Sequence, residues 1–200
     1  MKIRKDFITN SSSSSFIVIN TEDYDIDNLI ISEHELEHFR NIGIFEYGKY
    51  QFGWEEEKSY DFKSKMNFLL ILLGRLAEYL KDIKEDSSKK IEYEKDLKNL
   101  TEYRENLLQA VSDIGIEDID WTKVLDRISY KHDDYAYIDH QSNILEHDYS
   151  MLLESVSNIQ SFLFNEKSYI ITSNDNDFHD SNSDEYCERY YDNKENCFTV

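Results

Sequence analysis

The chain has 200 residues, of which 40% are hydrophobic and 14% aromatic, far more apolar surface than a disordered acidic tail carries. Its 42 Asp and Glu residues outnumber its 22 Lys and Arg residues, so the formal charge is −20, which excludes proteins that bind nucleic-acid phosphates or anionic membranes directly. The longest apolar stretch, Phe68–Leu73, is far shorter than a membrane span, and no apolar signal segment follows the first residues. We therefore expect a folded, cytoplasmic protein.

The first predicted element is a short buried strand at Phe16–Ile19, which follows the polar serine run Ser11–Ser15. A short helix is expected at 32–41, because Ser32 and Glu35 form the capping-box pattern of a helix N-terminus. These two elements open the predicted fold.

The next segments, Ile44–Tyr47 and Tyr50–Trp54, flank a Gly-Lys pair, which predicts a β-hairpin. From Phe62–Leu80, apolar residues recur at the i, i+3, i+4 spacing of a core-facing helix. The polar connector Glu85–Lys90 then leads to a second apolar stripe over Ile91–Val111. The two long helices should pair as an antiparallel hairpin.

The last predicted elements are a short helix at Trp121–Ile128, a strand at Tyr135–Ile138, a helix at Tyr149–Phe164 and a strand at Ser168–Thr172. Residues 173–200 are rich in Asp, Asn, Ser and Tyr without apolar periodicity, which predicts an acidic loop or a weakly ordered tail.

The expected fold class is α+β, with a small mixed or antiparallel sheet covered by the long helical hairpin and the C-terminal helix. Residues 1–172 should form this single domain, and the tail should follow it.

The sequence His34-Glu35-Leu36-Glu37-His38 matches the H-E-x-x-H pattern, in which two histidines one helical turn apart bind zinc and the glutamate activates water. The charged neighbours Glu37 and Arg40 are unusual for a helix buried behind a metal, and Glu35 has a capping role available. An exposed helix start with incidental histidines is the simpler interpretation, and a divalent-metal site at His34 and His38 is the alternative.

Two polar clusters follow predicted strands, where sites are often built on rigid elements. Asp139 and His140 follow the strand at Tyr135–Ile138, whereas Asp175 and Asp177 follow the strand at Ser168–Thr172. If these strands are parallel neighbours, the four side chains converge on a cation or a small ligand. Turn formation explains the same residues, because Asp and Asn side chains bond to the local backbone.

The negative charge is concentrated in the second half of the chain. Residues 1–100 carry 15 basic and 20 acidic groups, whereas residues 101–200 carry 7 and 22. Such acidity either keeps a protein soluble or accelerates its association with a basic partner. The expected partner-binding acidic surface comprises Asp133, Asp134, Asp180, Asp184, Glu185 and Glu188.

The segment Phe7-Ile-Thr-Asn-Ser-Ser-Ser-Ser-Ser-Phe16 resembles the N-terminus of diverse small proteins from Gram-positive bacteria and their phages. Further segments within Phe52–Trp54, Tyr60–Phe68, Tyr137–Ser142 and Phe162–Asn176 are similar to a phage-associated family without an assigned activity. The resemblance implies a phage setting, with the host cytosol as the location, and no catalytic residues.

The leading hypothesis is a non-enzymatic acidic accessory protein that binds a basic protein partner and inhibits a host defence or nucleic-acid-processing complex, without a cofactor. The chain has no phosphate-binding loop and no dinucleotide or serine-hydrolase motif, which favours this hypothesis. The alternatives are a metal-dependent hydrolase or small-ligand-binding protein, and a structural component of a virion.

Overall fold

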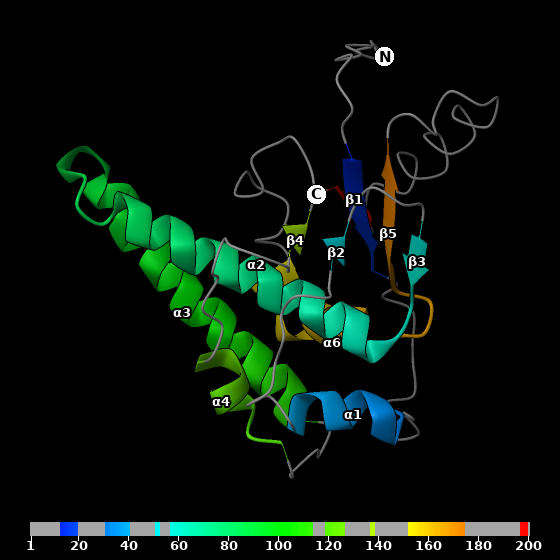
Figure 1. Ribbon diagram of the computed structural model, residues 1–200. Helices are drawn as coiled ribbons and strands as arrows, with labels where there is room; N and C mark the ends of the chain where they lie inside the picture. Colours follow the sequence, from blue (N-terminus) through cyan, green and yellow to red (C-terminus); the bar gives the residue numbers. More distant parts are fainter. Residues whose placement is uncertain are drawn as a thin grey trace.

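The computed structural model describes residues 13–19, 31–40, 51–52, 57–113, 119–126, 137–138, 152–174 and 197–199. Its main feature is a long antiparallel pair of helices, α2 (Phe62–Ile83) and α3 (Lys90–Ser112). The short 3-10 helix η3 (Ser87–Lys89) joins them, where the connector was predicted. Both predicted long helices are confirmed, and the turn between them points away from the sheet (Figure 1).

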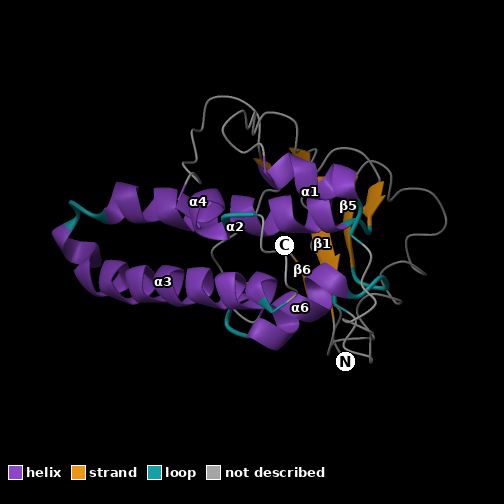
Figure 2. Ribbon diagram, turned by 90° about the horizontal axis from the view of Figure 1, so that it is seen from below, coloured by secondary structure: helices purple, strands orange, loops and turns teal. Residues whose placement is uncertain are grey.

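Three shorter helices pack around this pair near its open end. They are α1 (Glu33–Arg40), α4 (Trp121–Asp126) and α6 (Val156–Phe164). Seen from below, α2 and α3 form two rows, with α1 beside α2 and α6 beside α3 (Figure 2), and α4 contacts α3. The prediction of a longer last helix, Tyr149–Phe164, is corrected, because Ser155 caps a new helix start by accepting a hydrogen bond from the Asn158 backbone N–H.

A four-stranded antiparallel sheet has the order β3-β5-β1-β6, formed by β1 (Ser13–Val18), β3 (Glu57–Ser59), β5 (Tyr169–Asn174) and β6 (Cys197–Thr199). Strand β1 is central, pairing with β5 from Ser13↔Asn174 to Val18↔Tyr169 and with β6 over its last three residues. The predicted strand at Phe16–Ile19 therefore starts earlier and includes three residues of the serine run.

A second, two-stranded sheet pairs β2 (Gln51–Phe52) with β4 (Tyr137–Ile138) in parallel. The first strand of the predicted hairpin, Ile44–Tyr47, lies outside the described residues. The described part of its second strand is β2, and β2 pairs with β4, a strand far away in the sequence.

The predicted tail at 173–200 is corrected at both ends. Ser173 and Asn174 belong to β5, and Cys197–Thr199 form β6 beside β1. Residues 175–196 lie outside the described residues, so the tail stays a prediction there.

The predicted α+β class is wrong for the described part of the chain, which is mostly helical. Strands are short, and their described side chains contribute only Ile170 to the buried core. The core instead gathers helix residues such as Phe39 of α1, Leu69 of α2, Leu107 of α3 and Phe162 of α6. Helix packing therefore dominates the described fold, because amphipathic helices bury most of its apolar surface.

Helix α3 is the helix against which its neighbours are anchored. Arg104 donates to the Leu125 carbonyl at 3.0 Å and pairs with Asp126 of α4 at 2.6 Å. Asn106 donates to the Leu153 carbonyl at 2.9 Å, which holds the segment ahead of α6. These contacts fix the open end of the helix pair, where the candidate site lies.

Within the residues that the structure describes, no helix is both long enough and apolar enough to cross a membrane.

Candidate functional site

Polar side chains gather around the first turns of α2, where α1 and the end of α6 contact it, at the open end of the long helix pair. We call this set the α1–α2 polar cluster. It comprises Ser32, Glu35, His38, Asp61, Lys65 and Asn67.

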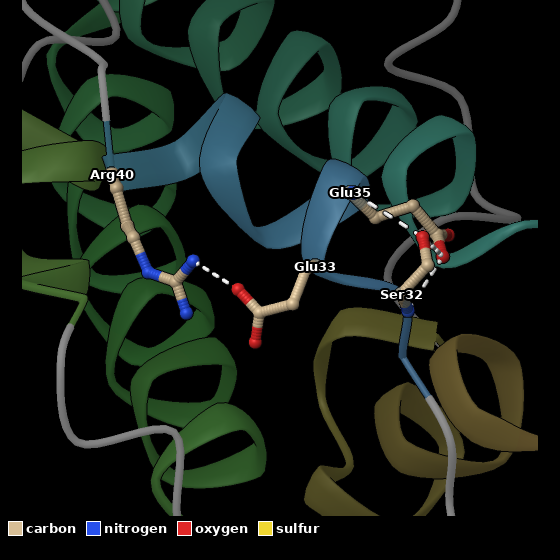
Figure 3. A network of polar contacts seen from close by, with 4 residues as sticks. All are labelled: Ser32, Glu33, Glu35 and Arg40. Atoms are coloured by element: carbon tan, nitrogen blue, oxygen red, sulfur yellow. Dashed lines mark hydrogen bonds and ion pairs between the residues drawn. The ribbon is translucent and has the colours of Figure 1, made fainter.

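The N-terminus of α1 has the capping box that the sequence predicts (Figure 3). The Ser32 backbone N–H and hydroxyl donate to the Glu35 Oε2 atom at 3.0 and 2.6 Å, and the Glu35 backbone N–H donates to the Ser32 Oγ atom at 3.3 Å. Farther along the helix, Arg40 pairs with Glu33 at 2.7 Å. The capping box thus fixes the start of this short helix.

Glu35 also joins α1 to α2. Its Oε1 atom accepts a hydrogen bond from the Lys63 backbone N–H at 3.4 Å, in the first turn of α2. The same turn is capped by Asp61, whose Oδ1 atom accepts from the Ser64 backbone N–H at 2.8 Å. Two carboxylates therefore lie at the positive end of the α2 dipole, which they stabilise.

His38 is half-buried, with its Nε2 atom 3.3 Å from the Asn67 Nδ2 atom. The Asn67 amide also donates to the Lys63 carbonyl at 2.8 Å, so its second N–H donates to a neutral imidazole. Burial of the ring, and next the charge of Lys63, lower the pKa of His38 to about 4. His38 is therefore uncharged at neutral pH.

This geometry does not support the alternative interpretation, a zinc site at His34 and His38. Glu35, which would activate water, is held in the capping box and by α2, and the Nε2 atom of His38 faces an amide. His34 is exposed. Among the described residues, no group of three His, Cys, Asp or Glu side chains is placed to hold a metal ion.

Three members of the cluster were not predicted from the sequence, namely Asp61, Lys65 and Asn67, and Lys65 is the most deeply buried of them. It is only 1% exposed, and its Nζ atom donates to the Asn165 carbonyl at 3.0 Å, at the C-terminus of α6. Burial lowers its pKa to about 8, although the charges of Asp61 and Glu35 oppose this shift. The ammonium group therefore links α2 to α6 through a hydrogen bond, but burying its charge lowers the stability of the folded state.

The remaining predicted site residues lie outside the described part of the chain, so the predicted convergence of the two polar strand ends stays a prediction. The same holds for the acidic surface. The residues concerned are Asp133, Asp134, Asp139, His140, Asp175, Asp177, Asp180, Asp184, Glu185 and Glu188.

The chain was compared with protein-family models, with curated proteins and with solved structures, and none of them matches it.

Proposed function

We propose that the protein is a non-enzymatic accessory protein of phage or prophage type, which binds a basic protein partner through acidic residues outside the long helix pair. The observation that carries this proposal is how the charge is divided along the chain. Residues 62–112, which span α2 and α3, contain 10 basic and 9 acidic side chains, whereas the rest of the chain contains 12 and 33. The excess negative charge thus lies outside the helix pair.

The contacts in the α1–α2 polar cluster support a binding protein over an enzyme. Its carboxylates cap helices, His38 faces Asn67, and the amine of Lys65 is buried against a backbone carbonyl. A catalytic acid, base or nucleophile must instead reach its substrate. These side chains are better explained as the framework that joins α1, α2 and α6.

A partner that suits such a surface carries concentrated Lys and Arg, as does a groove that binds nucleic acid. Occupying that groove would block nucleic acid and so inhibit a host defence or nucleic-acid-processing complex in the host cytosol. The association should be fast and sensitive to salt, because long-range attraction steers it.

Affinity capture from a lysate of a Gram-positive host, followed by identification of the captured proteins, tests the proposal. We expect basic proteins to bind at about 0.1 M salt and to be lost at about 1 M, where the Debye length falls from about 10 to about 3 Å. Each captured protein should also release a labelled DNA duplex when the acidic protein is added.

Two variants of equal charge locate the surface. The first changes the six predicted acidic residues to their amides: Asp133, Asp134, Asp180, Asp184, Glu185 and Glu188. The control changes six acidic residues of the helix pair in the same way: Asp82, Glu85, Glu94, Asp96, Glu102 and Glu105. We expect the first variant to lose the basic partner and the control to retain it. Equal loss from both variants, or loss from neither, contradicts the proposal.

A further inference from the structure

The closed end of the long helix pair differs in charge from the rest of the molecule. We call residues 81–98 the hairpin tip, which covers the end of α2, η3 and the start of α3. The tip contains six Lys and six Asp or Glu residues, so its net charge is zero in a chain of net −20. It is therefore a part of the molecule that does not repel a second copy.

The hairpin tip also lies beyond the other packed helices. Both views show α2 and α3 continuing past α1, α4 and α6 to the turn (Figures 1 and 2). Ile83 in the tip and Leu80 just before it are buried, but they do not join the main core cluster. The tip is thus a two-helix segment with a small apolar contact of its own, and two helices alone bury little surface.

Apolar side chains are exposed on the α3 part of the tip. Ile91 is 85% exposed and Leu97 is 43% exposed, and they are two of the three large hydrophobic side chains that are exposed among the described residues. Charged residues of both signs lie beside them on α3: Lys90, Glu94, Lys95 and Lys98. A surface with both signs of charge can be complementary to a copy of itself in a two-fold contact.

We infer that the hairpin tip is a self-association surface, at which the tips of two copies pack against each other in a helical bundle. An antiparallel contact between tips would place the open ends of the two helix pairs, with α1, α4 and α6, at opposite ends of the dimer (Figures 1 and 2). A helix of 22 residues spans about 33 Å, well beyond the Debye length of about 10 Å at 0.1 M salt. A strongly charged partner, by contrast, gains no net attraction from a neutral tip.

Sedimentation equilibrium over a range of protein concentrations tests this inference. We expect the full chain to form dimers reversibly and to nearly the same extent at about 0.1 and about 1 M salt, because the tip carries no net charge and repulsion over a helix length is already screened at 0.1 M. A basic partner should instead be lost at about 1 M salt, so the two proposals succeed or fail separately.

The double variant Ile91→Glu, Leu97→Glu should weaken dimerisation at least tenfold, because it replaces apolar contacts with two charges. Its matched control, Thr122→Glu, Ser157→Glu, adds the same charge at exposed positions of α4 and α6 and should dimerise as the unmodified chain does. Circular dichroism checks that both variants stay helical. A chain that is monomeric at every salt and protein concentration overturns the inference, as does a dimer that both variants weaken equally or that neither weakens.

Discussion

Lys65 places a charged group inside the packing between α2 and α6. Its pKa is lowered from an ordinary value of 10.5 to about 8 by burial, so the folded protein favours the neutral amine. Below pH 8 the group is protonated in both the folded and the unfolded state, and the folded state bears the full cost of about 3 kcal/mol. Between pH 8 and 10.5 the unfolded state binds more protons, so this contribution to the free energy of unfolding rises with pH.

Lys65→Met should therefore stabilise the protein at pH 7, by up to about 3 kcal/mol, because Met fills a similar volume without a charge. The Asn165 carbonyl still accepts a hydrogen bond from the Ser168 backbone N–H at 3.0 Å, so it is not left unpaired. Urea unfolding of both chains at pH 7 and pH 10 measures the effect, and their difference in stability should shrink at the higher pH. A variant that is less stable at pH 7 would show that favourable contacts of the Lys65 ammonium group outweigh the cost of burying its charge.

The sequence indicates that Lys65 is buried, but it gives only a weak indication that its neighbour Asn67 is buried. Lys65 lies three residues after Phe62 and four before Leu69, both on the predicted apolar stripe, so its burial could be predicted from spacing. Asn67 lies off that stripe and is buried because α1 packs there, which depends on tertiary structure. The capping role of Glu35 was predicted from the Ser32-x-x-Glu35 spacing and is confirmed, which explains the H-E-x-x-H match without a metal.

At the scale of elements, side-chain caps fix where helices begin. Ser32, Asp61, Asp86 and Ser155 each accept a hydrogen bond from a backbone N–H two or three residues later. Of the helices that these four residues cap, the one that Asp61 starts is the longest, and the charge of Asp61 also raises the pKa of Lys65 against the effect of burial.

Asp61→Ala should lower the free energy of unfolding by about 1 kcal/mol, because it leaves the Ser64 backbone N–H without its cap. Asp61→Asn is the matched control, since its amide oxygen can accept the same hydrogen bond without the charge. Denaturant unfolding should give a smaller loss for the Asn variant than for the Ala variant. Equal losses would assign the effect to charge instead of capping.

The long helices were predicted well because their signals are local, and the predicted strands at Phe16–Ile19, Tyr135–Ile138 and Ser168–Thr172 overlap β1, β4 and β5, but the pairing of the strands was not predicted. The spacing of apolar residues located α2 and α3 to within a few residues. Strand β1 includes Ser13 to Ser15, which have no strand preference of their own and are held by pairing with residues near 173. Pairing between segments so far apart in sequence leaves no local signal, which is why both the sheet order and the fold class required the structure.

For the whole molecule, the net charge of −20 should oppose the compact state through repulsion between carboxylates. The described ion pairs relieve little of it, because pairs such as Lys123 with Asp120 are exposed and worth little. Repulsion over longer distances depends on ionic strength, since the Debye length falls from about 30 Å at 0.01 M salt to about 8 Å at 0.15 M.

Raising the salt concentration from about 0.01 to about 0.15 M should therefore raise the melting temperature, as screening removes more repulsion from the folded state than from the expanded chain. Thermal unfolding followed by circular dichroism measures this change. The variant with six amides at Asp133, Asp134, Asp180, Asp184, Glu185 and Glu188 should respond less to salt than the matched helix-pair control, because it removes charge where the excess lies. A melting temperature that falls with salt would instead show that attractive ion pairs outweigh the net repulsion.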